Sequence, residues 1–265
     1  MDLQLKGKLA LVSGSTAGIG YVIAESLARE GCQVIVNGRT QKRVDAAVAK
    51  IVGAVGPVVD TVGLAADLGT AAGVAEMAAR FPQVDILVNN LGIFEPKRFE
   101  DIPDDDWLRF FEVNVLSGVR LSRHYLPRML ASGWGRVIFI SSESAVQIPA
   151  EMIHYGMTKT AQLAISRGLA ETTAGTGVTV NAVLPGPTAS EGVEGFVNNM
   201  AAAQGTDRAT VEREFFQSVR PTSLLRRFAT PEEVAAMVAF VASPLSAATN
   251  GAALRVDGGV VRSII

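Results

Sequence analysis

Short runs of apolar residues, many of them β-branched, recur along the chain and alternate with longer stretches that are apolar at every third or fourth position. The short runs are typical of buried strands, and the stretches between them have the length and period of amphipathic helices. The pattern predicts strands at Leu9 to Val12, Gln33 to Asn37, Val58 to Val62, Val84 to Asn89, Gly135 to Ser141, Val178 to Leu184 and Ala253 to Asp257.

These predicted strands are apolar on both faces, and connections of helical length join them. That combination is typical of a parallel sheet covered by helices on both sides, with right-handed crossovers between successive strands. The sequence therefore predicts an α/β fold in a single domain over residues 1–265, a doubly wound parallel β-sheet with helices on both faces. In such folds the ligand crevice lies outside the carboxyl ends of the strands.

One segment, Thr188 to Pro221, carries no strand pattern. A connection of this length inside a compact domain is usually either disordered or an active-site lid. Its Phe and Met residues favour the second interpretation, so residues 188–221 are predicted to form a substrate lid.

Composition and charge exclude several classes of function. The chain is 48% hydrophobic and has a net charge of −2, from 24 basic and 26 acidic residues without a basic block, so neither nucleic acid nor a membrane is expected as a partner. One cysteine allows no internal disulfide, and two histidines without clustered cysteines argue against zinc, so no metal is predicted. No apolar stretch suits a membrane span or a signal peptide, and a cytoplasmic location is expected.

The most informative candidate chemistry is a serine, a tyrosine and a lysine, Ser142, Tyr155 and Lys159, with spacings of 13 and 4 positions. Tyr155 and Lys159 lie one turn apart on the helix predicted from His154 to Leu169. A nearby ammonium favours the phenolate, so we expect Lys159 to lower the pKa of Tyr155 and make it an acid or base near neutral pH. The Ser142 hydroxyl could bind a carbonyl oxygen. By itself, such a tyrosine and lysine pair is usually a surface contact.

A glycine-rich turn follows the first predicted strand and precedes a helical pattern from Val22 to Ala28. Strand, glycine turn and helix is the order of a dinucleotide phosphate site, because glycines let the backbone approach the pyrophosphate and the helix N-terminus holds the anion. The candidate residues are Gly14, Ser15, Thr16, Gly18, Ile19 and Gly20. The alternative is a turn that only links a strand to a helix.

Together these motifs resemble the classical short-chain dehydrogenase/reductase (SDR) family. In the family's order the chain carries the glycine turn, Asp67, Asn89-Asn90-Leu91-Gly92, Asn114, Ser142, Tyr155, Lys159, Asn181, Pro185-Gly186 and Asp257-Gly258-Gly259. The resemblance covers essentially the whole chain, with Ser13 and Leu91 where the family commonly has Thr and Ala. It implies a Rossmann-like NAD(P)-binding domain that transfers hydride reversibly between nicotinamide and a carbonyl or secondary alcohol.

By this resemblance the catalytic residues are Asn114, Ser142, Tyr155 and Lys159. Ser142 would donate a hydrogen bond to the carbonyl oxygen, Tyr155 would deliver the proton, and Lys159 would also bind the nicotinamide ribose. Asn114 would locally open its helix, predicted from Trp107 to Leu130, and hold a water that touches Lys159.

The resemblance also assigns cofactor contacts. Besides the glycine turn, Tyr155 and Lys159, they comprise Asp67, Leu68, Asn89, Gly92, Pro185, Gly186 and Thr188, with Ser190 as the alternative to Thr188. Relatives that prefer NAD carry an acidic residue where Gly38 stands, whereas here Arg39 follows and can pair with a 2′-phosphate. NADP is therefore the predicted cofactor and NAD the alternative. The plainer interpretations are a solvated helix start for Arg39, a helix cap for Asp67, and ordinary turns for the Asn and Pro segments.

The predicted substrate is a small to medium, mainly apolar ketone, ketoester or 3-oxoacyl compound, and not a sugar or a highly charged metabolite. The residues expected around it are mostly apolar: Leu91, Ile93, Phe94, Val146, Ile148 and Met152, with Phe196, Met200, Phe215 and Phe216 from the lid. Ser142, Tyr155 and Gln147 are the expected polar contacts, and His154 is expected at the surface. Since relatives are commonly tetramers, a homotetramer is predicted. The alternatives are an NAD-dependent alcohol dehydrogenase of this family, a non-catalytic dinucleotide sensor, and a dehydratase or epimerase, which usually has a larger second domain.

Overall fold

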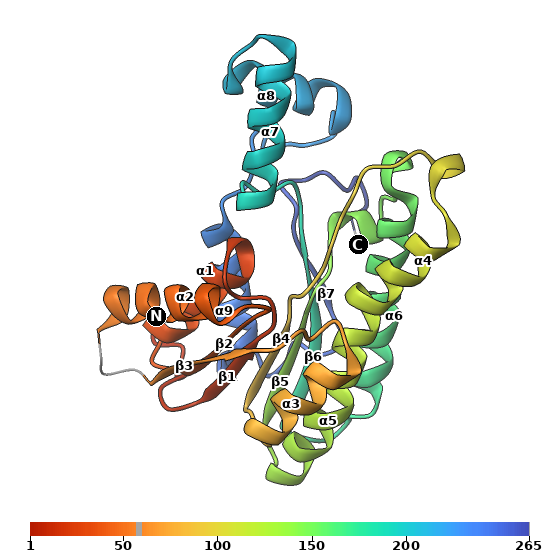
Figure 1. Cartoon of the computed structure of the whole chain (residues 1–265). Helices are drawn as coiled ribbons and strands as arrows, with labels where there is room; N and C mark the ends of the chain where they lie inside the picture. Colours follow the sequence, from red (N-terminus) through yellow and green to blue (C-terminus); the bar gives the residue numbers. More distant parts are fainter. Residues whose placement is uncertain (57–59, 265) are drawn as a thin grey trace.

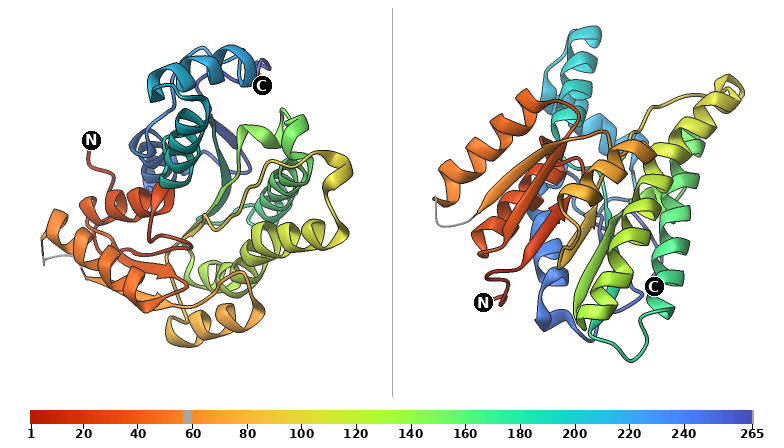
Figure 2. Two further views of the ribbon diagram at one scale, coloured as in Figure 1. Left: turned by 45° about the horizontal axis from the view of Figure 1, so that its top comes forward. Right: turned by 60° about the horizontal axis from the view of Figure 1, so that its bottom comes forward.

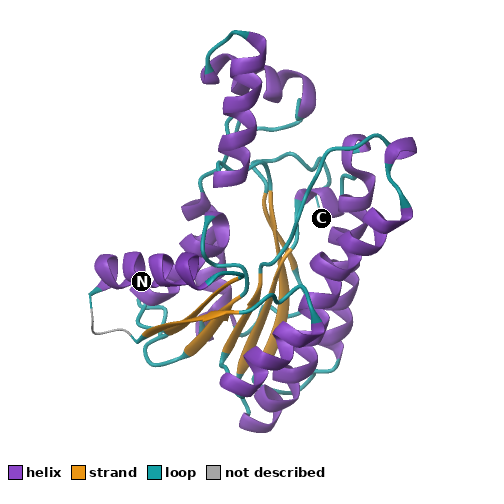
Figure 3. Cartoon of the chain, viewed as in Figure 1, coloured by secondary structure: helices purple, strands orange, loops and turns teal. Residues whose placement is uncertain are grey.

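The structure is a computed structural model that describes residues 1–56 and 60–264, without the side chains of Glu194, Phe196, Asn199, Ala203 and Gln204. Within these residues, seven parallel strands form one sheet, and helices cover both of its faces (Figures 1 and 3). The doubly wound α/β fold predicted from the apolar runs is confirmed.

The strands are β1 (Leu9–Val12), β2 (Gln33–Gly38), β3 (Thr61–Ala65), β4 (Ile86–Asn89), β5 (Gly135–Ile140), β6 (Val178–Pro185) and β7 (Ala253–Val256). The α-helices are α1 (Gly18–Arg29), α2 (Gln41–Val55), α3 (Ala71–Arg80), α4 (Asp104–Phe111), α5 (Ser117–Ser132), α6 (Ile153–Glu171), α7 (Glu191–Gln204), α8 (Arg208–Glu214) and α9 (Pro231–Ala242). Short helical turns are η1 (Phe99–Asp101), η2 (Glu112–Leu116), η3 (Glu143–Ala145), η4 (Ala150–Met152), η5 (Phe215–Val219) and η6 (Pro244–Ser246), of which η2 and η5 are π-helical.

The strand order is β3-β2-β1-β4-β5-β6-β7. Helices α1, α2 and α9 pack on one face of the sheet, and α3, α5 and α6 pack on the other (Figure 2). Each face has its own apolar core, with residues such as Leu27 and Val238 in one and Leu121 and Tyr125 in the other. Because the chain reverses its direction of travel across the sheet between β1 and β4, the crevice opens at the carboxyl ends of these strands.

The third strand begins later than predicted. The expected strand was Val58 to Val62, of which residues 58 and 59 lie outside the described residues, whereas β3 is Thr61–Ala65. Glycine is a weak strand former, and the predicted strand therefore ends before Gly63. In the fold it is required there, because a Cβ at Gly63 would lie 2.2 Å from Cγ1 of Val44 on α2.

The long helix predicted from Trp107 to Leu130 consists of α4, the π-helical turn η2 and α5. The local opening expected at Asn114 is present as η2. Its side chain bonds outside the helix, with Oδ1 accepting from the Ile93 amide at 2.7 Å and Nδ2 donating to the Ile93 carbonyl at 3.0 Å. These bonds tie the helix to the loop that follows β4.

Residues 188–221 form mainly helix, with α7, α8 and η5 standing above the carboxyl ends of the strands (Figure 1). The side chain of Asp207 caps α8 by accepting from the Thr210 amide at 2.8 Å. A separate apolar cluster holds the segment together and contains Val197, Ala201, Val211, Phe216 and Phe228. None of the described helices is long and apolar enough to cross a membrane.

Candidate active site

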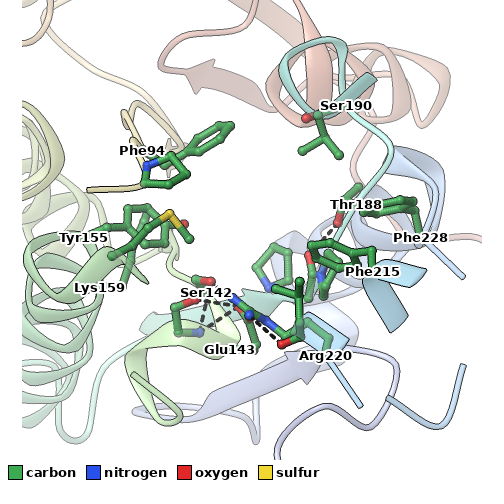
Figure 4. Close-up of a pocket in the computed structure, with 18 of the residues that line it drawn as sticks. Phe94, Ser142, Glu143, Tyr155, Lys159, Thr188, Ser190, Phe215, Arg220 and Phe228 are labelled. Carbon is green, nitrogen blue, oxygen red and sulfur yellow. Dashed lines mark hydrogen bonds and ion pairs between the residues drawn. The ribbon is translucent and has the colours of Figure 1, made fainter. Parts of the chain in front are cut away.

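The predicted catalytic side chains come from three elements and meet in one pocket. Ser142 follows β5, Tyr155 and Lys159 lie on the first two turns of α6, and Asn114 lies in η2 behind them. The pocket has a volume of about 530 Å³ and lies between the end of the sheet and residues 188–221 (Figure 4). Ser142, Tyr155 and Lys159 line it, while Asn114 is buried beneath.

Tyr155 lies next to Ser142 in the pocket, and its ring meets Phe94 edge-on at a centroid distance of 6.4 Å (Figure 4). Burial raises the pKa of the Tyr155 phenol above its ordinary value, and the nearby Ser142 hydroxyl only partly opposes this shift. Lys159 is not among the groups that shift this pKa, so the expectation that it lowers the pKa of Tyr155 is wrong. The ammonium stands 5.6 Å from the ring centroid, and burial lowers the pKa of Lys159 itself to about 8.

Gln162 joins Lys159 to Asn114. Nζ of Lys159 donates to the Ile140 carbonyl at 3.0 Å and to Oε1 of Gln162 at 3.3 Å, and Nε2 of Gln162 donates to the Asn114 carbonyl at 2.6 Å. The resemblance implies a water held by Asn114 that touches Lys159, and Gln162 is a further link between these two residues. Sequence reasoning missed Gln162, although its position three residues after Lys159 puts both on one face of α6.

The glycine turn is held by side chains at the ends of neighbouring strands. The Ser13 hydroxyl accepts from the amides of Asn90 and Leu91 at 2.9 and 3.0 Å. Serine thus keeps a hydroxyl at the position where the family commonly has threonine. Nδ2 of Asn90 donates to the carbonyls of Ser13 and Gly14 at 2.9 and 3.1 Å. A Cβ at Gly20 would lie 2.5 Å from the Gly14 oxygen and 2.4 Å from Nδ2 of Asn90, so the turn has no room for a side chain.

The other predicted cofactor residues lie around the same crevice. Asp67 is exposed and accepts from the Gly69 amide at 3.0 Å, while Thr70, not Asp67, caps α3. Leu68 and Asn89 are buried, and Nδ2 of Asn89 donates to Oγ of Ser122 at 3.2 Å. Gly92 lines the pocket together with Pro185, Gly186, Thr188 and Ser190. Arg39 is exposed, and no carboxylate in the described part of the chain pairs with it.

Part of the predicted apolar lining is present. Ile93, Phe94, Met152, Met200 and Phe215 line the pocket, whereas Leu91, Val146, Ile148 and Phe216 do not. The side chain of Phe196 lies outside the described residues. Gln147 is exposed and is not part of the lining.

His154 does not lie at the surface as expected. It is fully buried, with its ring 4.1 Å from that of Phe110, because α4 packs against the start of α6. Burial lowers the pKa of this histidine.

A buried ion network next to Ser142 was missed entirely by sequence reasoning. The Ser142 hydroxyl donates to Oε2 of Glu143 at 2.5 Å, and the same oxygen accepts from the amide and hydroxyl of Ser144 at 2.7 and 3.0 Å. Nε of Arg220, directly after η5, donates to Oε1 of Glu143 at 3.1 Å, and Nη1 donates to Oε1 of Glu151 at 2.9 Å (Figure 4). Burial alone would lower the pKa of Arg220, but Glu151 and Glu143 raise it above its usual value.

Comparison with known proteins identifies the family of this chain. Residues 14–261 match the family model described as enoyl-(acyl carrier protein) reductase. The chain is 53% identical over its whole length, and that of the relative, to the uncharacterized oxidoreductase YvaG of Bacillus subtilis. The chain belongs to the short-chain dehydrogenase/reductase family. It is an oxidoreductase of this family, as the ordered motifs implied.

More distant SDR relatives have named activities. The chain is 35% identical to D-beta-hydroxybutyrate dehydrogenase of Cupriavidus necator, over 97% of this chain and 99% of that one. Among solved structures it is similar to L-sorbose reductase of Gluconobacter frateurii, complexed with NADPH and L-sorbose, with 31% identity, full coverage of both chains and a TM-score of 0.91.

The glycine turn of this SDR chain fits a dinucleotide. The first turn of α1 contains no acidic residue, and no side chain caps its N-terminus, so the positive end of the helix is left for an anion. The space that a Cβ at Gly20 would close lets the backbone come near that anion.

Proposed function

We propose that this protein is an NADPH-preferring carbonyl reductase that also runs in the reverse direction, with Tyr155 as the general acid and base. The observation that carries the proposal is that Ser142 and Tyr155 line one pocket, with Lys159 buried beside them. A protein that only senses a dinucleotide would need the glycine turn but not this group of side chains.

In reduction, the Ser142 hydroxyl turns from Glu143 to the carbonyl oxygen, and Glu143 keeps its bonds from Ser144 and Arg220. Tyr155 donates its proton to the same oxygen, which stabilises the charge that develops there. Lys159 supplies a nearby positive charge as the phenolate forms, while Asn114 and Gln162 hold the lysine in place. When bound, the cofactor supplies the hydride.

The proposed cofactor site is formed by the glycine turn from Gly14 to Gly20, with Asp67, Leu68, Asn89 and Gly92 toward the adenosine and the centre of the crevice. Tyr155, Lys159, Pro185, Gly186 and Thr188 would lie at the nicotinamide end. Arg39 supports NADPH over NADH, because its guanidinium is exposed just after β2 and has no carboxylate partner among the described residues.

Arg39→Ile is expected to weaken NADPH binding by about ten- to hundredfold, the loss of one charge-assisted contact of roughly 1.5 to 3 kcal/mol, and to leave NADH binding unchanged. Fluorescence titration with both cofactors measures this. Arg43→Ile on α2 is the matched control, because Arg43 faces Glu191 at 3.6 Å, and it should leave both affinities within about threefold. Tighter binding of NADH than NADPH by the parent protein would contradict the assignment.

Relatives that prefer NAD carry an acidic residue where Gly38 stands, but the structure leaves no room for a side chain at this position. A Cβ there would lie 2.5 Å from Cγ2 of Thr16. An acidic substitution would therefore displace the glycine turn and weaken the binding of both NADPH and NADH.

The kcat/KM for carbonyl reduction is expected to fall as the pH rises through about 8, where Lys159 loses its proton. Tyr155 keeps its own proton in this range because burial raises its pKa. The decrease in kcat/KM is therefore assigned to deprotonation of Lys159. A pH profile of kcat/KM at saturating NADPH measures it. Activity that stays constant well above this pH would show that the charge of Lys159 is not needed.

We propose a small to medium ketone, ketoester or 3-oxoacyl compound with an apolar body as substrate. Phe94, Met152, Met200 and Phe215 support it, because they would pack against such a body from both walls of the pocket. We further propose one domain over residues 1–265, a homotetramer and a cytoplasmic location. Leu108 and Phe111, exposed apolar side chains on α4, support an interface between subunits.

A further inference from the structure

The substrate side of the pocket carries more negative than positive charge. Among the described residues that line it, three are acidic, Glu143, Glu151 and Glu214, and two are basic, Lys159 and Arg220. Lys159 lies below Tyr155 and donates to the Ile140 carbonyl and to Gln162, away from the lid. Arg220 is therefore the cation available on the lid side, against three carboxylates.

Arg220 is already occupied by two of these carboxylates. Its Nε donates to Glu143, and its Nη1 donates to Glu151 and to the Val219 carbonyl at 2.9 Å. The guanidinium side chain is only 10% exposed. A substrate carboxylate that approached the remaining Nη2 group of Arg220 would lie beside Glu143 and Glu151, whose two negative charges exceed the single positive charge of Arg220, which is unfavourable in a partly buried site.

Glu151, in contrast, has acceptor capacity to spare. It lies in η4, next to Met152 in the pocket wall, and its side chain is 43% exposed. Its bond from Arg220 uses Oε1. A carboxylate has about four lone-pair positions, so Glu151 can accept a further hydrogen bond from a ligand hydroxyl without losing its ion pair.

We propose that this pocket selects uncharged carbonyl substrates that carry a hydroxyl group near the carbonyl, that Glu151 accepts the hydrogen bond of this hydroxyl, and that carboxylate substrates are rejected. This inference rests on the proposed function and names its substrate class. Glu143 bonds directly to Ser142, which is proposed to bind the substrate carbonyl oxygen. A substituent a few bonds from that carbonyl therefore reaches the acidic residues of the pocket. The apolar wall then packs against the remainder of the substrate.

The test compares matched ketones that differ only at one end: acetoacetate, its methyl ester, and the hydroxy ketone in which the ester group is replaced by a primary alcohol. With the parent protein and NADPH, kcat/KM is expected to be at least about tenfold higher for the ester than for the acid, from repulsion between like charges. The hydroxy ketone should exceed the unbranched methyl ketone of equal length by about fivefold or more.

Glu151→Gln removes the charge and weakens the acceptor. It should lower the ratio of ester to acid by about fivefold and also reduce the preference for the hydroxy ketone. Glu151→Asp keeps the charge but shortens the reach, so rejection of the acid should remain while the hydroxyl preference falls. Glu76→Gln, an exposed change of equal charge on α3, is the matched control and should leave both ratios unchanged.

Binding separates this inference from the proposed reaction. Calorimetric titration of the NADP⁺ complex of Tyr155→Phe with the ester, the acid and the hydroxy ketone requires no turnover, and the same order of affinity is expected. If no ketone is reduced but this order appears, the proposed reaction fails and the substrate class stands. An acid bound or reduced as well as its ester, ratios unaffected by both Glu151 variants, or no detectable binding of any of the three compounds would overturn the inference.

Discussion

Tyr155→Phe is expected to lower kcat by about a thousandfold and to leave NADPH binding within a few-fold of the parent. The substitution removes one oxygen, the proposed proton donor, and general acid catalysis of this kind contributes about a hundred- to ten-thousandfold. The ring is retained, so its edge-on contact with Phe94 and the packing at the start of α6 should remain. Steady-state kinetics with an accepted ketone, together with cofactor titration, measure both quantities.

The loss should appear in kcat as well as in kcat/KM, because the proton is transferred only in the transition state. Tyr21→Phe, a change of the same kind on α1 whose hydroxyl interacts with Glu25, is a suitable control and should keep full activity. Turnover by Tyr155→Phe within tenfold of the parent would refute the role assigned to this tyrosine.

Gly20→Ala is expected to weaken NADPH binding by about a hundredfold and to destabilise the fold by roughly 2 to 5 kcal/mol. The added Cβ would collide with the Gly14 carbonyl and with the amide of Asn90, so the two hydrogen bonds that hold the turn would be lost or bent. Thermal unfolding with and without NADPH, followed by cofactor titration, separates loss of stability from loss of the site.

Gly53→Ala is the matched control, because Gly53 lies in α2 and a Cβ there meets no atom within 4 Å. It should raise stability by about 0.4 to 1 kcal/mol, since alanine loses less conformational freedom than glycine in a helix. If Gly20→Ala bound NADPH as tightly as Gly53→Ala, the turn would not be the phosphate site.

The positions of the principal side chains follow from local sequence. Tyr155 and Lys159 share a helix face because they lie one turn apart, and Ser142 follows a mainly apolar strand. The glycine turn could be recognised for the same reason, since strand, turn and helix are consecutive in the chain. Such short-range patterns depend on backbone geometry that adjacent residues set among themselves.

What the tertiary structure alone decided is the environment of these side chains. Arg220 lies 77 positions from Glu143, and only the tertiary packing of residues 188–221 over the sheet brings its guanidinium to the carboxylate that accepts from Ser142. The direction of the Tyr155 pKa shift likewise depends on how much water the surrounding elements exclude, which no spacing in the sequence expresses. The reaction chemistry could therefore be predicted from the order of motifs, whereas the charge of the substrate pocket required the contacts between distant segments.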